Sequence, residues 1–262
     1  MYVHGIRALF PFPGYVVRKV TMTTDIVQVI LRRDRRFRLA CPACGGTMGV
    51  NRTSTQTARD LAMGTARLVV LTYPAIQGRC SACGCWATIH PPGIDPHAKA
   101  TRRLMHFVCR LARYMPLSHI PEIVAISERT AGRWDRKVLR EHLPKPDLDN
   151  LRVLLIDEKA VRKRHGYVTL VMNGVTGELL HLAKGCRWAA VSGVEALRAF
   201  ARSLLRAKEE VLNYCKHRIT TGRLEGFNNT VSRIVHRACG MQDLDYLFLK
   251  LRQESLDFVL QT

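Results

Sequence analysis

Four cysteines in the N-terminal third of the chain are paired in a way that predicts a metal site. The segments CPAC (41–44) and CSAC (80–83) each hold two cysteines separated by two residues, and a glycine follows each segment. Each segment can present two thiolates from one tight turn, and four thiolates form the closed tetrahedral site of structural zinc. We predict Zn2+ with a structural role, bound by Cys41, Cys44, Cys80 and Cys83. Cys85 is an alternative to Cys83, and free buried cysteines are the alternative to a metal.

Two acidic residues far apart in the sequence predict a second kind of metal chemistry. Asp157 closes the apolar run VLLID (153–157), which is typical of a buried strand, and Glu225 lies near the start of a predicted helix. Carboxylates in two such places can share divalent ions, which activate a water or a 3′-hydroxyl and stabilise the leaving oxygen in phosphoryl transfer. The alternative is that Asp157 only caps the turn after its strand.

A third group of residues is suited to contact with nucleic acid. Residues 115–143 predict a short helix around 119–125, a turn near Ile126-Ser127 and a basic helix that begins after Ser127 or Thr130. This is the pattern of a helix-turn-helix, whose second helix enters the major groove of DNA. An ordinary helix pair with a solvated basic face is the alternative. The side chains expected to meet bases or phosphates are Arg129, Thr130, Arg133, Arg136 and Lys137.

The charge balance agrees with a polyanionic partner. The chain holds 41 Lys and Arg against 21 Asp and Glu, a formal net charge of +20. Residues 1–150 alone contain 23 basic and 10 acidic residues, and the remainder is also basic, so no single tail carries the excess. Such a surface attracts nucleic acid. The alternatives are a generally basic soluble protein and a protein that binds a membrane surface. Because no run of 18 apolar residues exists, we expect no membrane span.

The cysteine pairs and the N-terminal sequence indicate a compartment. The first 20 residues do not have the layout of a signal peptide. Paired C-x-x-C segments in such a chain indicate a metal rather than disulfides, and the cytoplasm, close to the nucleoid, is the expected location. The scattered residues Cys109, Cys186, Cys215 and Cys239 are expected in the core.

The elements that must position the N-terminal groups are strands followed by helices. Residues 25–40 predict two short strands, joined at Arg33-Asp34-Arg35 into a hairpin with a basic rim. Residues 66–80 predict a further strand, so a hairpin fills the interval between the cysteine pairs. PPGIDP (91–96) is expected to be a linker. From Thr101 apolar residues recur at helical spacing.

The C-terminal half predicts strands and then helices. After a linker at 144–150, strands are expected at 153–157, 166–174 and 177–185. Helices are expected over 194–217, over 223–238 with a stop at Gly240, and over 243–260.

The order of these features resembles the insertion-sequence transposases of the ISL family, which belong to the bacterial DDE class. Two segments carry the resemblance, VLLIDEKAVRKRHGYVTLVMNGVTGELLHLAKG (153–185) and ITTGRLEGFNNTVSRIVHRACG (219–240). The resemblance implies an α+β multi-domain fold. Its parts would be an N-terminal zinc ribbon (1–95), a helical helix-turn-helix DNA-binding domain (96–145) and a truncated ribonuclease-H-like α/β domain (150–262).

The same resemblance assigns roles to the two acidic residues and to two further residues close to Glu225 in the sequence. Asp157 corresponds to the first catalytic Asp of the family and Glu225 to its final Glu, so both would bind catalytic Mg2+ or Mn2+. Arg223 and Asn228 would contact DNA nearby. The family's middle Asp has no counterpart, because the 67 residues between Asp157 and Glu225 contain no Asp. The family has a longer interval here, so the chain resembles one joined internally near 187–195, without central strands.

Three interpretations of function follow from the resemblance. The first is a transposase that binds the terminal inverted repeats of a transposon as double-stranded DNA and cuts and joins strands with a divalent metal. The second is a non-catalytic DNA-binding protein or repressor derived from a transposase, a homo-oligomer through its C-terminal half. The third is a decayed product without function. The missing Asp favours the second and third interpretations over an active enzyme.

Overall fold

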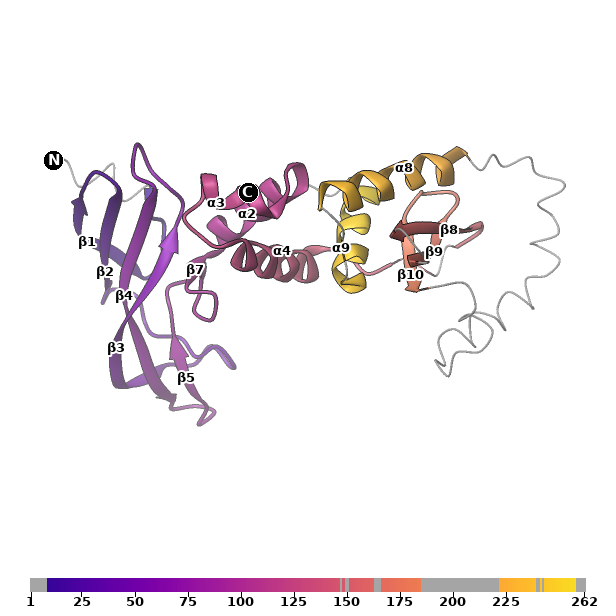
Figure 1. Ribbon diagram of the computed structural model, residues 1–262. Coiled ribbons are helices and arrows are strands. Elements are labelled where there is room, and N and C mark those ends of the chain that lie inside the picture. Colours follow the sequence, from indigo (N-terminus) through magenta and orange to yellow (C-terminus); the bar gives the residue numbers. More distant parts are fainter. Residues whose placement is uncertain are drawn as a thin grey trace. The chain divides into compact units, whose positions relative to one another are not determined.

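The chain divides into two compact units, residues 1–135 and residues 136–261. The computed structural model describes residues 9–146, 148, 151–162, 166–184, 222–238, 241 and 243–257 (Figure 1). The predicted helix over 194–217, the junction near 187–195, the stop at Gly240 and the residues Cys186, Cys215 and Cys239 lie outside these described residues. The mixture of sheet and helix confirms the predicted α+β class.

A mixed seven-stranded sheet dominates the first unit, in the order β1-β2-β4-β3-β7-β6 with β5 paired to β4. β1 runs antiparallel to β2, β2 runs parallel to β4, and β3 and β4 form a long antiparallel hairpin. Alternating apolar residues from β2 and β4 are buried, among them Val27, Val29, Val69 and Leu71. The strands are β1 (Tyr15–Met22), β2 (Ile26–Arg33), β3 (Met48–Asp60), β4 (Leu68–Cys80), β5 (Trp86–Ile89), β6 (Ile94–Asp95) and β7 (Ala100–Thr101).

Two predictions for this sheet are wrong. The predicted hairpin within 25–40 is instead the single strand β2, which pairs with β1 in the Gly- and Pro-rich N-terminal stretch. Arg33-Asp34-Arg35 lies at the end of β2 and does not join two strands of a hairpin. The segment 91–96 is more than a linker, because Ile94 and Asp95 form β6 and pair with β7. The predicted hairpin between the cysteine pairs is confirmed as β3 and β4.

The helices of the first unit follow the sheet directly. They are α2 (Arg102–Tyr114), the 3-10 turn η1 (Leu117–His119), α3 (Ile120–Ile123) and α4 (Glu128–His142). The Thr101 hydroxyl caps α2 by accepting a hydrogen bond from the Leu104 amide, as an N-cap residue does. Leu104 and Val108 are buried as the predicted helical spacing requires. The boundary between the two units falls inside α4, between Asp135 and Arg136.

The second unit packs two helices with an antiparallel sheet. β8 (Leu154–Arg162), β9 (Gly166–Asn173) and β10 (Leu179–Lys184) pair in the order β10-β9-β8. The core that they share with α8 (Gly222–Arg237) and α9 (Leu244–Ser255) includes Leu170, Leu179, Val231, Leu247 and Leu251. Of the six elements predicted for the C-terminal half, these five are present, and the helix over 194–217 lies outside the described residues. β8 continues past Asp157 to Arg162, so the prediction that Asp157 closes its strand is wrong. None of the helices in the described ranges is long and apolar enough to cross a membrane.

Candidate metal centre and acidic site

The two C-x-x-C segments form two turns with the same backbone hydrogen bonds. In the first turn the Cys41 amide donates to Gly46 O at 2.7 Å and the Gly45 amide donates to Cys41 O at 2.8 Å. In the second turn the Cys80 amide donates to Cys85 O at 2.9 Å and the Gly84 amide donates to Cys80 O at 3.1 Å. Gly45 and Gly84 have φ angles of 72° and 71°, a left-handed conformation in which a Cβ atom is costly. The glycine after each cysteine pair therefore supplies the permissive backbone that the turn requires.

Long-range pairing places the two turns opposite each other. Met48 at the start of β3 pairs with Cys80 at the end of β4, so the hairpin returns the chain to the first turn. The amide and the hydroxyl of Ser81 both donate to Thr47 O, at 3.2 and 3.1 Å. Leu39, Met48 and Ile76 form a small buried cluster with Cys41 and Cys80 beneath the turns. Nothing in the sequence pattern had singled out Ser81.

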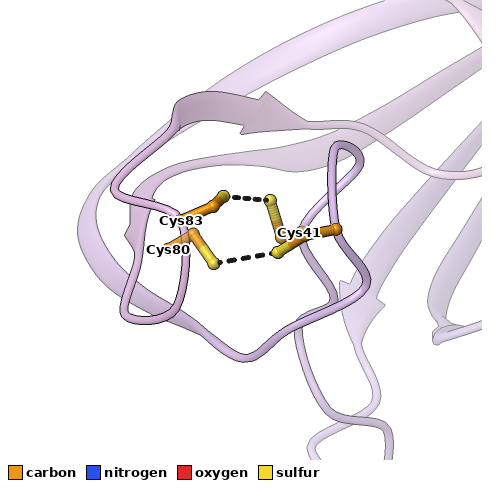
Figure 2. A group of neighbouring side chains, drawn as sticks. Cys41, Cys80 and Cys83 are labelled. Atoms are coloured by element: carbon orange, nitrogen blue, oxygen red, sulfur yellow. Dashed lines mark hydrogen bonds between the residues drawn. The ribbon is translucent and has the colours of Figure 1, made fainter.

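The four predicted ligands converge on one point between the turns. Cys41 Sγ lies 3.7 Å from Cys83 Sγ, Cys44 Sγ lies 3.5 Å from Cys80 Sγ, and all four sulfurs lie within 4.8 Å of one another (Figure 2). A tetrahedral site with Zn–S bonds of ~2.3 Å places its sulfurs ~3.8 Å apart, whereas a disulfide brings them to ~2.05 Å. The sulfur spacing therefore fits a tetrahedral zinc ion and does not fit a pair of disulfides.

The backbone of each turn also favours the thiolate form that a metal requires. The amides of Cys83 and Ala82 donate toward Cys80 and lower its pKa to about 6, against the opposing effect of burial. The amides of Cys44 and Ala43 lower the pKa of Cys41 in the same way. Each turn thus holds one buried cysteine whose negative charge is stabilised by N–H dipoles.

Cys85 does not take part in the cluster. Its sulfur lies 3.5 Å from Trp86 O, and the group of four potential ligands consists of Cys41, Cys44, Cys80 and Cys83. Cys41 and Cys80 are buried, and Cys44 and Cys83 are exposed. In the part of the chain that the structure describes, this is the only group of three or more Cys, His, Asp or Glu side chains close enough to hold an ion. Cys109 is buried in α2, as predicted for a core cysteine.

The acidic pair lies on two elements that pack together in the second unit. Asp157 is half-buried on β8, and Glu225 is exposed in the first turn of α8. One helical turn after Glu225, Asn228 donates a side-chain N–H hydrogen bond to Asp157 Oδ2. Residues three apart lie on the same side of a helix, so Glu225 and Asn228 belong to one side of α8. The structure therefore brings Asn228 against Asp157, a contact that the sequence did not predict.

Arg223, the other residue predicted near the acidic pair, is engaged with the backbone of a turn. Its Nη1 atom donates to Gly174 O at 3.3 Å and also to Val175 O, in the turn between β9 and β10. In that turn Asn173 Oδ1 accepts from the amides of Val175 and Thr176 at 2.9 and 3.2 Å. Arg223 thereby connects the start of α8 to the β9–β10 turn.

In the segment predicted to be a helix-turn-helix, Ser127 is the N-cap of α4, the first of the two predicted choices. Ser127 Oγ accepts from the Thr130 amide at 3.3 Å, and the Ser127 carbonyl accepts from the Ala131 amide at 2.9 Å. Thr130 therefore lies inside the first turn of the helix. The turn residues Ala125 and Ile126 were both predicted to face the tight crossing of the two helices. Ile126 is buried, whereas Ala125 is exposed, so the prediction is wrong for Ala125.

The five side chains predicted to contact DNA divide into two groups. Arg129 and Arg133 are exposed and lie one turn apart on α4, with Thr130 half-buried beside them. Arg136 is half-buried instead, 2.7 Å from Asp243 Oδ2, and its guanidinium lies 4.9 Å from the centre of the Tyr246 ring. Lys137 lies 3.9 Å from Glu141. The side chains most open to a ligand are therefore Arg129 and Arg133.

Comparison with known proteins finds a similarity to transposases in the C-terminal part of the chain, over a range that contains Glu225 and does not reach Asp157. Residues 175–251 match a family model for DDE transposases of the ISL3 type, described as a transposase. The matched range includes α8, with Glu225 and Asn228, and most of α9. This C-terminal segment of the chain is therefore similar to DDE transposases of the ISL3 type.

One curated relative agrees with the family match. Over 61 residues the chain is 43% identical to the transposase for insertion sequence element IS1001 of Bordetella parapertussis. The matched stretch covers 23% of this chain and 15% of that relative, so the chain spans a small part of the relative's length. No solved structure matches the chain.

Proposed function

We propose that this chain is a transposase-derived protein that binds duplex DNA with its N-terminal unit and does not complete strand cleavage. The partner would be the terminal repeats of a transposon, in the cytoplasm near the nucleoid. Two features of the acidic site support the proposed loss of cleavage. The 67 residues between Asp157 and Glu225 contain no Asp, and the Asp157 carboxylate accepts a hydrogen bond from the side-chain amide of Asn228.

The position of two exposed arginines on α4 and the charge of the chain support DNA binding. Arg129 and Arg133 are exposed in the N-terminal half of α4, the part of a recognition helix that reaches base edges. The short helix α3 precedes α4 across the turn at Ile126-Ser127, in the order of a helix-turn-helix. Because the chain carries a net charge of +20, attraction to phosphates would add to any base contact.

The four-cysteine cluster supports the same unit. Four thiolates occupy every position of a tetrahedral ion, so Zn2+ bound there would hold the β3–β4 hairpin closed and take no part in catalysis. The seven-stranded sheet and the start of α4 belong to one compact unit. The proposed division is a ribbon (1–95), a helix-turn-helix (96–145) and a ribonuclease-H-like remnant (150–262). It would place the ribbon and most of the helix-turn-helix within that unit.

Too few carboxylates are present in the acidic site to support strand cleavage. Two metal ions on a transferring phosphoryl group require several carboxylates to offset their charge. Asp157 and Glu225 supply two, and a metal ion bound to Asp157 would compete with the hydrogen bond from Asn228. An internal junction near 187–195, with loss of the central strands, accounts for the missing third acid. The same loss would leave sheet edges open, which favours a homo-oligomer.

An active transposase is the second candidate, and one observation favours it. Asp157 and Glu225 are both retained, on β8 and α8, which pack together in one unit. An acid from a second copy of the chain or from elsewhere in this one would then complete the site.

One experiment separates the two candidates. The full chain is loaded with Zn2+ and mixed with a labelled duplex that ends in the transposon's terminal repeat, with Mg2+ or Mn2+ present. We expect a shifted complex and an intact duplex. Arg129→Gln/Arg133→Gln should abolish the preference for the repeat over a scrambled duplex, and Asp157→Ala should bind normally. Strand cleavage that disappears in Asp157→Ala would establish the active enzyme, and an absence of any complex at low salt would refute DNA binding.

A further inference from the structure

The first unit contains a second strongly basic segment, which comes before the predicted helix-turn-helix in the sequence. The segment Arg32–Arg38 reads RRDRRFR, with five arginines and one aspartate in seven residues. It occupies the end of β2 and the loop that leads to the first cysteine turn. The proposed function does not use this segment.

Asp34 organises this loop from inside. It is buried, and its amide donates to Gly14 O at 2.8 Å while its carbonyl accepts from the Phe37 amide at 3.2 Å. Its carboxylate accepts from both the amide and the guanidinium of Arg36, the closest contact being 2.6 Å. These hydrogen bonds with Arg36 lower the pKa of Asp34 to about 2, so the carboxylate is charged at any physiological pH. The loop is thus fixed by contacts that do not depend on a ligand.

The arginines of the loop are not equally engaged. Arg33 Nη2 donates to Phe37 O at 3.0 Å, and Arg36 is held by Asp34. Arg32 and Arg35 are exposed, and neither side chain makes a hydrogen bond or ion pair with the residues that the structure describes. Four arginines, Asp34 and Val16 line a hollow of about 650 Å³. Of the described residues around this hollow, Asp34 is the only acid, so the lining has a net positive charge.

We infer that this arginine loop, residues 32–36, is a second DNA contact that binds the phosphodiester backbone without reading sequence. The inference extends the proposed DNA binding and rests on it. A guanidinium offers two parallel donors to a phosphate, and a loop that is already ordered loses little entropy when it binds. Arg32 and Arg35 would meet the phosphates directly, while Asp34 and Arg36 hold the loop in shape.

The test measures how binding depends on salt. Fluorescence anisotropy with a random 30-base-pair duplex gives Kd from 50 to 300 mM KCl for the zinc-loaded full chain and its variants. Each phosphate contact contributes about −0.9 to the slope of log K against log salt. We therefore expect Arg32→Gln/Arg35→Gln to reduce the slope by roughly 1 to 2 and to weaken binding on the order of tenfold at 100 mM KCl. The loss should be the same for the terminal-repeat duplex and for a scrambled one.

A control variant that removes the same number of charges elsewhere distinguishes a specific contact from an effect of net charge. Arg52→Gln/Arg67→Gln also removes two exposed arginines of the first unit, outside the loop. If this control lowers the affinity as much as the loop variant does, the effect is bulk charge and the inference is overturned. Binding by Arg32→Gln/Arg35→Gln that equals the unmodified chain also overturns it. In that case, if Arg129→Gln/Arg133→Gln still weakens DNA binding, the proposed function stands and only the inference about the loop fails. If the unmodified chain does not bind DNA at all, both the proposed function and the inference are refuted.

Asp34→Ala separates an ordered site from a cluster of charges. The substitution raises the net charge by one, so a simple charge effect would tighten binding to DNA. If the loop acts because it is ordered, Asp34→Ala weakens binding severalfold while circular dichroism and zinc content stay unchanged. Tighter binding by Asp34→Ala would overturn the ordered site.

Discussion

Asn228 on α8 donates its side-chain amide to the Oδ2 atom of Asp157 on β8, so the first acid of the candidate catalytic pair is tied to the helix that carries the second. A residue for which the resemblance predicted DNA contact therefore connects two elements of the core. The contact explains how α8 is oriented on the strand, and it places the side of the helix that includes Glu225 near Asp157.

Removal of this contact should weaken the second unit. Asn228→Ala deletes a hydrogen bond to a charged group, which we expect to lower the free energy of unfolding by about 1 to 2 kcal/mol. Asn229→Ala is the matched control, because Asn229 is the exposed neighbour on the same helix. Urea denaturation followed by far-UV circular dichroism gives both values. Equal stability of the two variants would show that the Asn228–Asp157 bond does not hold the helix on the sheet.

The positions of the sulfurs predict that Cys83, and not Cys85, is the fourth zinc ligand. Cys83→Ser should reduce bound zinc from one ion per chain to a small fraction, since three thiolates hold the ion less tightly than four. Cys85→Ser should keep the full ion, because the Cys85 sulfur lies outside the cluster. Mass spectrometry of the metal in purified protein decides between them. Zinc that survives Cys83→Ser and disappears in Cys85→Ser would reverse the assignment of the fourth ligand.

Local patterns predicted the parts of the molecule that depend on neighbours in sequence. The C-x-x-C segments carry their own glycines and hydrogen bonds, so both turns and all four ligands were predictable. The Ser127 cap and the helix after Thr101 follow in the same way from capping and apolar spacing. The strands of the second unit are short apolar runs bounded by turn residues, and they were found for that reason.

Pairing between distant segments escaped prediction. β1 lies in a stretch rich in Gly and Pro, and only its partner β2, with which it pairs from Tyr15↔Arg33 to Met22↔Val27, makes it a strand. Asp95 and Ile94 look like part of a linker until β7 pairs with them. Asn228 and Asp157 are 71 residues apart, and no periodicity connects an amide on a helix with a carboxylate on a strand.

Gly78 on β4 should tolerate no side chain. A Cβ atom there would lie 2.0 Å from Gly49 O on the paired strand, a clash with backbone that the hairpin can relieve only by separating its strands. We expect Gly78→Ala to cost about 3 kcal/mol or more and to lower the melting temperature sharply. Gly64→Ala is the control: its φ is +60°, nothing lies within 4 Å of an added Cβ, and the cost should be about 1 to 2 kcal/mol. Similar melting temperatures for the two variants would contradict the close approach at Gly78.

The ion pair between Asp60 and Arg103 should matter far more than its counterparts on the surface. The Asp60 side chain is fully buried, and it accepts hydrogen bonds from Arg103 Nε and from the Thr101 hydroxyl, each at 2.7 Å. Arg103→Met would leave a buried carboxylate with only two neutral donors, the Thr101 hydroxyl and the Leu61 amide, which we expect to cost about 3 kcal/mol or more. Lys137→Met removes one partner of an accessible pair on α4, where the two side chains are about one-third exposed and 3.9 Å apart, and should cost under about 1 kcal/mol.

The physical reason for the contrast is solvation. Water can replace Lys137 beside Glu141, but it cannot reach Asp60 without opening the junction between β3 and α2. Because Asp60 ends β3 and Thr101 caps α2, the loss in Arg103→Met should appear as weakened attachment of the helix to the sheet. Hydrogen exchange of the α2 amides should therefore accelerate in Arg103→Met and stay unchanged in Lys137→Met. If both variants unfold at the same urea concentration, the buried pair does not stabilise that junction.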